Sequence, residues 1–415
     1  MDLKKTYILL AVLAVTACSQ AWEGELMIDH TIGIGNNPGV RVPSEDTRDV
    51  LLLYSAGHNS ISSYLSEDIS DLCSGWVPGD KRSEDVLLVY SHFPASSGRY
   101  KEKTSPTLSR IYRNLDGETV CDTLVTYEKG TVSSSAEQLD EVLTYVRRKF
   151  PARGYGMIFS SHATGYLPSH YYSKPDDYVF GDGTAQMSVG QDVADTASYE
   201  IDIRDFAEAI PFKMDYILFD ACLMGGIEVA YELAGKCGKV GFSQAEVLAE
   251  GFNYRTLSTH LLQSDEPDPE SVCDDYFQQY DIQDGINRSA TISMIDCDSL
   301  EPLAALCAEL FDRYRSGLDG INPRNVQRFY RGDRHWFYDL ESVIENAGAS
   351  AEDISRLHKA LDQCVLYKGH TPSFMYEFDI DTFSGFSMYL PCNGSGQLDM
   401  YYKTLKWNKA TSLVP

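Results

Sequence analysis

A short hydrophobic segment that ends in an acid and a cysteine constrains this sequence more than any other feature. Residues 216–224 read Tyr-Ile-Leu-Phe-Asp-Ala-Cys-Leu-Met, and two glycines then lead into residues 227–233, where apolar positions follow helical spacing. This pattern predicts a buried strand, a tight turn and a helix. Ligands of open parallel sheets bind beyond the carboxyl ends of the strands. Cys222 is therefore expected at such an end, where the positive end of the helix dipole would favour a thiolate.

A second hydrophobic segment, residues 156–161, ends in a histidine that small residues follow. His162 precedes Cys222 by about 60 residues, and a histidine followed about 50 residues later by a cysteine is the order found in caspases. A buried core cysteine and a histidine satisfied at a strand end are the ordinary structural explanations for such residues. The two motifs together favour a catalytic pair over both explanations.

The two motifs resemble the active-site motifs of one peptidase family. The turn of residues 162–165 (His-Ala-Thr-Gly) and residues 220–224 (Asp-Ala-Cys-Leu-Met) are similar to those of the clostripain family of cysteine peptidases, which shares a caspase-like α/β fold with gingipains and legumains. The resemblance covers most of residues 48–412. It implies that Cys222 is the nucleophile, that His162 is the general acid/base, and that backbone N–H groups near Ala163 and Cys222 bind the oxyanion.

Two positions depart from the family pattern. The family usually has glycine directly after the histidine and tryptophan where Tyr166 stands, whereas this chain has Ala163. Alanine keeps the amide donor, but it would cost about 1 kcal/mol or more if the turn required a positive φ. This departure leaves open a weakened or inactive variant, and the alternative function is then a non-catalytic surface binding lipoprotein on the same scaffold.

Two acids bear on substrate specificity. Strand side chains alternate, so Asp220 and Cys222 are expected to point to the same face. An anion beside a thiol raises the thiol pKa, which favours catalysis only if a substrate cation neutralises the anion. In the family the matching aspartate lines the S1 pocket for Arg or Lys, and Glu250 stands in the region that supplies a second S1 acid, although a solvated loop acid is the alternative. The resemblance thus implies protein or peptide substrates cleaved after Arg or Lys.

The amino terminus resembles a bacterial export signal. Lys4 and Lys5 precede an apolar run, residues 7–15, that is too short to span a bilayer, which predicts a signal peptide over residues 1–17. Cys18 follows a small residue as in a lipobox, so we expect a lipidated Cys18, a tether over residues 18–47, and anchoring in the cell envelope through the lipid alone. Cleavage for soluble secretion is the alternative.

The composition excludes some partners. The chain has 35 basic and 61 acidic residues, and phosphate binding needs a concentrated positive face, so nucleic acid is not expected as a partner. Ten cysteines and nine histidines form no zinc spacing, so we predict no catalytic metal, no cofactor and no assigned disulfide. Acids at Asp176, Asp177 and Asp182 give only a weak calcium signal.

Alternating strand and helix patterns predict an α/β fold: a caspase-like, mostly parallel sheet flanked by helices over residues 48–265. A C-terminal subdomain over residues 266–415 is expected to pack on this core as a helical and β extension. The patterns predict strands at residues 49–56, 86–90, 239–243, 291–295 and 383–391, a hairpin at 109–127, helices at 135–150, 301–314 and 351–367, and a long polar loop at 168–197.

Overall fold

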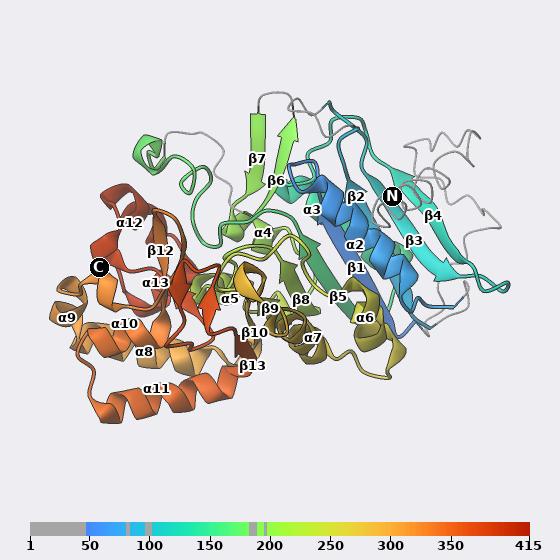
Figure 1. Ribbon diagram of the computed structural model, residues 1–415. Coiled ribbons are helices and arrows are strands. Elements are labelled where there is room, and N and C mark those ends of the chain that lie inside the picture. The colour runs from blue at the N-terminus through green and yellow to red at the C-terminus, as the bar shows by residue number, and fades with distance from the viewer. Residues whose placement is uncertain (1–46, 80–83, 96–101, 182–188, 195–196) are drawn as a thin grey trace.

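The computed structural model describes residues 47–79, 84–95, 102–181, 189–194 and 197–415 (Figure 1). The expected signal peptide, the lipidated Cys18 and the tether lie outside the described residues, apart from Thr47. Among the described residues the largest sheet has nine strands, in the order β13-β10-β9-β8-β5-β1-β2-β3-β4. Within the described part of the chain no helix is long and apolar enough to cross a membrane.

Five parallel strands form the centre of this sheet. All eight residues of β1 are buried, as expected for a parallel strand that helices cover on both faces. The predicted α/β fold with a mostly parallel sheet is therefore confirmed. The five strands are β9 (Cys237–Phe242), β8 (Met214–Asp220), β5 (Gly154–Ser160), β1 (Asp49–Ala56) and β2 (Val86–His92).

Antiparallel strands complete both edges of the sheet. On one side the predicted hairpin pairs with β2, and its turn contains Gly117 at a φ of 83°. On the other side two strands from the C-terminal third extend the sheet, because β10 pairs with β9 and β13 pairs with β10. The sheet therefore crosses the expected boundary at residue 265. The edge strands are β3 (Thr107–Arg113) and β4 (Thr119–Thr126), and β10 (Thr291–Asp296) and β13 (Val365–His370).

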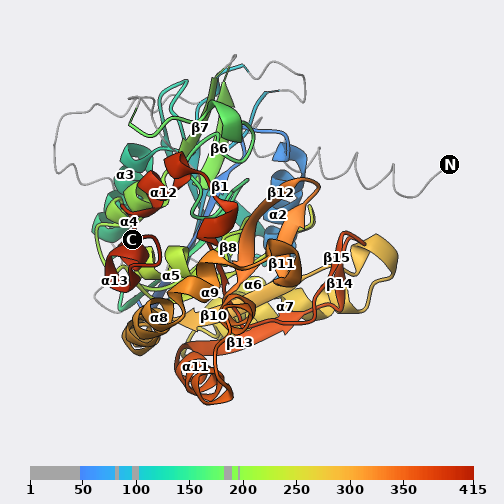
Figure 2. The ribbon, with the colours of Figure 1, turned by 90° about the vertical axis from the view of Figure 1, so that its left-hand side faces the viewer.

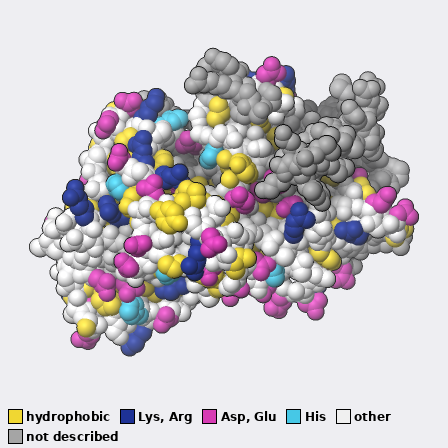
Figure 3. Space-filling view, in the orientation of Figure 1, with side chains coloured by type: hydrophobic (Ala, Val, Ile, Leu, Met, Phe, Trp, Pro, Cys, Tyr) yellow, Lys and Arg dark blue, Asp and Glu magenta, His cyan; other side chains and the backbone are white. Residues whose placement is uncertain are grey.

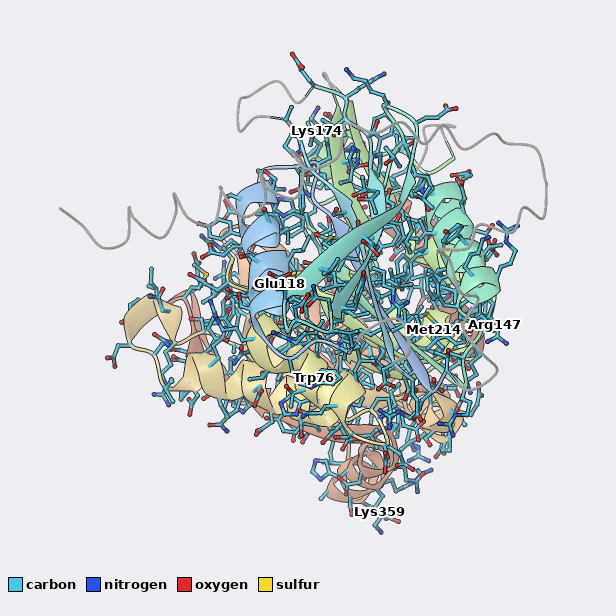
Figure 4. All side chains as sticks on the ribbon, turned by 90° about the vertical axis from the view of Figure 1, so that its right-hand side faces the viewer. Trp76, Glu118, Arg147, Lys174, Met214 and Lys359 are labelled. Carbon is cyan, nitrogen blue, oxygen red and sulfur yellow. The ribbon has the colours of Figure 1, made fainter. Side chains whose placement is uncertain are left out.

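Helices cover both faces of the sheet because the strands present apolar side chains alternately to each. Leu51 and Leu53 of β1 pack in one core with α2, α6 and α7, while Leu52 and Tyr54 pack in the other core with α3, α4 and α5. Figure 4 shows α2 and α3 on opposite sides of the sheet. The helices are α2 (Ser62–Ser74), α6 (Tyr254–Ser258) and α7 (Pro269–Asp281), and α3 (Ala136–Lys149), α4 (Ile203–Glu208) and α5 (Ile227–Leu233).

In the rest of the C-terminal third, α13 and β16 pack against α5, and α13 also packs against α8 (Figure 2). Trp407, Tyr401 and Tyr402 are fully buried and belong to the same core as the α5 face of the sheet, so this part extends the core. Its elements are α8 (Glu301–Arg313), α9 (Arg315–Asp319), β11 (Arg328–Arg331), β12 (Arg334–Asp339), α10 (Leu340–Asn346), α11 (Ala351–Cys364), β14 (Ser373–Phe374), β15 (Phe378–Asp379), β16 (Ser387–Met388), α12 (Gly396–Tyr402) and α13 (Lys406–Thr411).

Three predicted elements need correction. The helix expected at 351–367 ends at Cys364, because Val365 begins β13 and pairs with β10. The polar loop expected at 168–197 contains β6 (Val189–Ala194), which pairs with β7 (Ala197–Ile201). The strand expected at 383–391 has only its two residues of β16 in a ladder. In each case the secondary structure depends on whether a distant strand pairs with the segment. A local hydrophobic pattern carries no information about that pairing.

Candidate active site

The sheet brings the two candidate catalytic residues to neighbouring strand ends. β5 and β8 are adjacent and parallel, and Ser160 is the register partner of Asp220. His162 and Cys222 each stand two residues beyond that pair. The Ser161 N–H also donates to the Asp220 carbonyl oxygen at 3.4 Å, which continues the pairing past the strand ends. The two residues therefore lie at the same edge of the sheet, where parallel α/β sheets bind their ligands.

His162 is half-buried beside the loop that follows β1. Its Nε2 lies 2.9 Å from the Ser60 hydroxyl oxygen. Burial lowers the pKa of His162 below its ordinary value, because a low-dielectric environment disfavours the imidazolium form. The ring is therefore neutral at neutral pH and able to accept a proton.

The Cys222 thiol is held by the loop between β9 and α6, residues 243–253 (the β9–α6 loop). The Val247 N–H donates to Sγ at 3.3 Å, and the Val247 carbonyl oxygen lies 3.8 Å from the same sulfur. Burial, then the negative charge of Glu246 and to a smaller extent that of Asp220, raise the pKa of Cys222 to about 12. The thiol is therefore protonated at neutral pH.

The expected thiolate is thus wrong for this state of the molecule. The α5 helix begins at Ile227, five residues beyond Cys222, and a helix dipole acts mainly within the first turn. Desolvation of the sulfur outweighs that effect. A thiolate at Cys222 would therefore require a base that removes the proton.

The residue after the cysteine has a strained backbone that sequence reasoning missed. Leu223 has a φ of 62°, is buried, and donates its N–H to the Ala245 carbonyl oxygen at 2.8 Å. A left-handed conformation costs a non-glycine residue about 1–2 kcal/mol, and such strain clusters at functional sites. Gly165 fits tightly against this turn, because a Cβ at position 165 would lie 2.3 Å from the Leu223 carbonyl oxygen. No pattern in the sequence signals a left-handed leucine.

The two departures from the family pattern are accommodated without backbone strain. Ala163 does not adopt a positive φ, whereas Gly165, two residues later, has a φ of 61°. The penalty expected for alanine is therefore absent. Tyr166 is fully buried, packs against the rings of Phe337 and Tyr402, and donates its hydroxyl to the Trp336 carbonyl oxygen.

Asp220 lies against the β9–α6 loop and is nearly buried, with 6 % of its surface exposed. Its Oδ2 accepts a hydrogen bond of 2.7 Å from the Tyr254 hydroxyl, and a Cβ at Gly251 would lie 2.3 Å from that oxygen. Burial raises the pKa of Asp220 to about 6, partly offset by the Tyr254 hydroxyl and by the backbone of Phe252. At neutral pH Asp220 is therefore mostly a buried anion close to the thiol.

Glu250 is exposed on the same loop, one residue before Gly251. Its charge raises the pKa of Asp68 on α2 and of Tyr280 on α7. The charge of Asp220 raises the pKa of the same two groups, so both acids act on the same side chains. Both acids that the sequence suggested for specificity thus gather around the same loop. Figure 3 shows acidic and basic side chains intermixed over the described part of the face seen in Figure 1.

The acids suggested for calcium do not gather into a site among the described residues. Asp176 and Asp177 are exposed on the short helix η1 (Pro175–Asp177), and Asp182 lies outside the described residues. The described part of the chain contains no group of three His, Cys, Asp or Glu side chains that could hold a metal ion.

A parallel sheet covered by helices on both faces, with a histidine and a cysteine at adjacent strand ends, defines a caspase-like cysteine peptidase. The family model described as "Clostripain family" matches residues 53–413. The chain therefore belongs to the clostripain family of cysteine peptidases.

Solved structures support this assignment. The inactive zymogen C11 protease from Parabacteroides distasonis is 27 % identical, with a TM-score of 0.73, over 89 % of this chain and 99 % of that one. The secreted C11 cysteine protease iotapain from Bacteroides thetaiotaomicron is 26 % identical, with a TM-score of 0.72, over 88 % of this chain and 99 % of that one. A complex of a secreted C11 cysteine protease from the same organism with an irreversible peptide inhibitor, 23 % identical with a TM-score of 0.71, shares the fold over 88 % of this chain and 99 % of that one. No curated protein matched. The family match and the two structures above 25 % identity thus identify the chain as a cysteine peptidase.

Proposed function

We propose that this peptidase cleaves after Arg or Lys and that His162 and Cys222 form its catalytic dyad. The observation that carries the proposal is the register of β5 and β8, which puts both residues two positions beyond the paired Ser160 and Asp220. A nucleophile and its base must come within hydrogen-bonding reach during catalysis, and adjacent strand ends allow this.

The protonation states support a dyad that starts neutral. Burial lowers the pKa of His162, whereas burial and Glu246 raise the pKa of Cys222. His162 then removes the thiol proton as sulfur attacks the carbonyl carbon, and it returns the proton to the leaving amine. Backbone N–H groups near Ala163 and Cys222 would bind the oxyanion. Water that His162 deprotonates then hydrolyses the acyl-enzyme.

The preference for a basic P1 residue rests on Asp220. A nearly buried carboxylate beside the nucleophile has a large desolvation cost unless a cation pairs with it. Tyr254 supplies only one neutral hydrogen bond. A P1 Arg or Lys would supply the missing charge, and Glu250 at the exposed end of the loop would attract the same cation.

A latent state of the enzyme has its own support. The Val247 main chain contacts the Cys222 sulfur, and a substrate carbonyl must approach that sulfur. A solved relative is described as an inactive zymogen. The absence of a positive φ at Ala163 removes one physical argument for a permanently inactive binding protein. We therefore propose that the β9–α6 loop must shift before substrate binds, and that a non-catalytic binding role is the alternative.

Covalent labelling tests the dyad and the P1 preference together. An arginyl or lysyl chloromethyl ketone should label the wild type once, on Cys222. Cys222→Ala should abolish labelling and cleavage, and His162→Ala should abolish cleavage, while Cys392→Ala, which removes an exposed cysteine, should leave both unchanged. Labelling that survives in Cys222→Ala would overturn the dyad. Equal or faster turnover of peptides with neutral or acidic P1 residues would overturn the specificity.

We also propose export with lipidation at Cys18, based on the apolar run at residues 7–15 and the small residues before the cysteine. Metabolic labelling with a radioactive fatty acid should mark the wild type and leave Cys18→Ala unmarked. Equal labelling of both would contradict the anchor. Release of the unlabelled wild type into the medium would favour the soluble alternative.

A further inference from the structure

A third acid, on a different element, lies in the neighbourhood of Asp220 and Glu250. Asp68 belongs to α2 and is 7 % exposed. Its Oδ2 is buried and has no hydrogen-bond partner among the residues that the structure describes. Buried polar atoms without a partner are uncommon, and each calls for an explanation. Asp68 has no role in the proposed dyad, and it takes no part in the contacts of the β9–α6 loop described above.

The charges that act on Asp68 are acidic. Burial, followed by the charges of Asp220, Asp71, Glu67 and Glu250, raises the pKa of Asp68 to about 9. Asp68 also acts on the hydroxyl groups of Tyr254 and Tyr280, which flank Asp220 and Gly251. Asp68 also shares the buried face of α2 with Leu72, which packs in one core with Tyr254 and Tyr280. Its carboxyl group therefore lies on the side of α2 that faces Tyr254, the hydrogen-bond partner of Asp220.

Two acids in one buried site, with an unused oxygen, are an unfavourable arrangement for the protein alone. Like charges at short range keep one of the two protonated. The arrangement becomes favourable when a cation enters, because guanidinium and ammonium groups donate several hydrogen bonds to carboxylates. Thus the unpartnered oxygen of Asp68 matches a ligand that brings both positive charge and N–H donors.

We propose that Asp68 is a specificity-determining residue of the S1 pocket, and that its free oxygen binds the P1 cation together with Asp220. This inference rests on the proposed basic P1 preference and extends it to a residue on α2. Binding of the cation releases the Asp68 proton to solvent. No covalent bond of the substrate is involved in this step.

A purely structural role is the rival explanation, in which Asp68 and Asp220 share a proton as a buried pair. Asparagine has the shape of a protonated aspartic acid and retains a donor, so Asp68→Asn preserves the structural role and removes the negative charge. Glu67→Gln is the matched control, because Glu67 is the neighbouring acid on the same helix and is exposed. Both variants change the net charge by one.

Paired substrates isolate the charge at P1. We expect Asp68→Asn to lower kcat/KM for arginine and lysine peptides by about 10- to 100-fold, mainly through KM, as for the loss of one charged hydrogen bond. The same peptides with citrulline or norleucine at P1 should be unaffected. Glu67→Gln should change neither class by more than about twofold. An equal loss on charged and neutral substrates, or no loss, would overturn the role of Asp68.

A binding measurement provides a test that does not depend on how well Asp68→Asn folds. The titratable or charged groups around Asp68 are Asp220 on β8, Glu250 on the loop, Tyr254 on α6 and Tyr280 on α7, together with the flanking Glu67 and with Asp71, which pairs with Arg255. The cation binds the deprotonated form, so the Kd of an arginine peptide for Cys222→Ala should fall as pH rises from about 7.5 to 9.5 and then level off.

The experiments distinguish failure of this inference from failure of the basic P1 preference on which it rests. A Kd that does not change over that pH range would overturn the role of Asp68 and leave the basic P1 preference standing. A wild type that cleaves citrulline peptides as well as arginine peptides would overturn both.

Discussion

Gly251 gives the sharpest test of how the loop holds Asp220. The residue has a φ of 56°, and an added Cβ would lie 2.3 Å from Oδ2 of Asp220 and 2.8 Å from Oδ1. Real Cβ atoms hardly ever approach within 3.0 Å of another heavy atom. Gly251→Ala must therefore either move the loop or push the carboxylate away from the Tyr254 hydroxyl, which lies 2.7 Å from Oδ2.

The expected magnitude follows from two contributions. A left-handed alanine costs about 1–2 kcal/mol, and the loss of a hydrogen bond to a charged group costs about 1.5–3 kcal/mol. Gly235 provides the matched control, because its φ is 79° and an added Cβ would meet nothing within 4 Å. Gly235→Ala should therefore show only the first contribution. Thus Gly251→Ala should be less stable than Gly235→Ala by about 1.5–3 kcal/mol.

Urea unfolding followed by tryptophan fluorescence measures that difference, and kcat/KM on arginine and citrulline peptides measures the effect on the site. We expect Gly251→Ala to lose selectivity for arginine and Gly235→Ala to retain it. Equal stabilities of the two variants would refute the packing of Gly251 against Asp220. A Gly251→Ala variant with the predicted instability but unchanged arginine selectivity would refute the role of Asp220 in substrate recognition.

Three further predictions concern the thiol, the turn beside it and the intact chain. Glu246→Gln should speed iodoacetamide labelling of Cys222 at pH 8–9, because the Glu246 charge raises the pKa of the thiol; an unchanged rate would contradict that influence. Gly165→Ala should remove most peptidase activity. Residue 165 has a φ of 61°, and a Cβ there would lie 2.3 Å from the Leu223 carbonyl oxygen, so the variant would disturb the turn after the proposed nucleophile Cys222. Normal turnover would show that this contact is dispensable. Lys174 is exposed near β6 and β7 (Figure 4) and is the only Lys or Arg in the sequence from 163 to 203. A proline follows it and disfavours the geometry of a peptide bound to a peptidase. Intact-mass analysis should therefore show no self-cleavage after Lys174, and a fragment that ends there would contradict this.

Several features could be predicted from the sequence because they depend on local patterns. The apolar run at 49–56 predicted β1 with its observed bounds, and Ser135 caps α3 through the Gln138 N–H as the sequence spacing indicates. His162 and Cys222 were found as candidates because each ends an apolar strand within a short motif. The register of β5 with β8 then places both at one edge of the sheet.

Other features depend on contacts between segments far apart in the chain. The boundary between α11 and β13 at residue 364 follows from pairing with β10, which no local period reveals. Asp68 became a candidate only when the packed fold brought α2 next to α6. Its spacing from Asp220 in the sequence gave no signal.

The sequence by itself determined the class of fold and the two candidate catalytic side chains, because periodic apolar residues and short motifs act over a few neighbouring positions. Only the tertiary structure decided that the thiol is protonated, that Leu223 is left-handed and that Asp220 is nearly buried beneath the loop. Desolvation and Coulomb interactions depend on every group packed nearby, whatever its position in the chain.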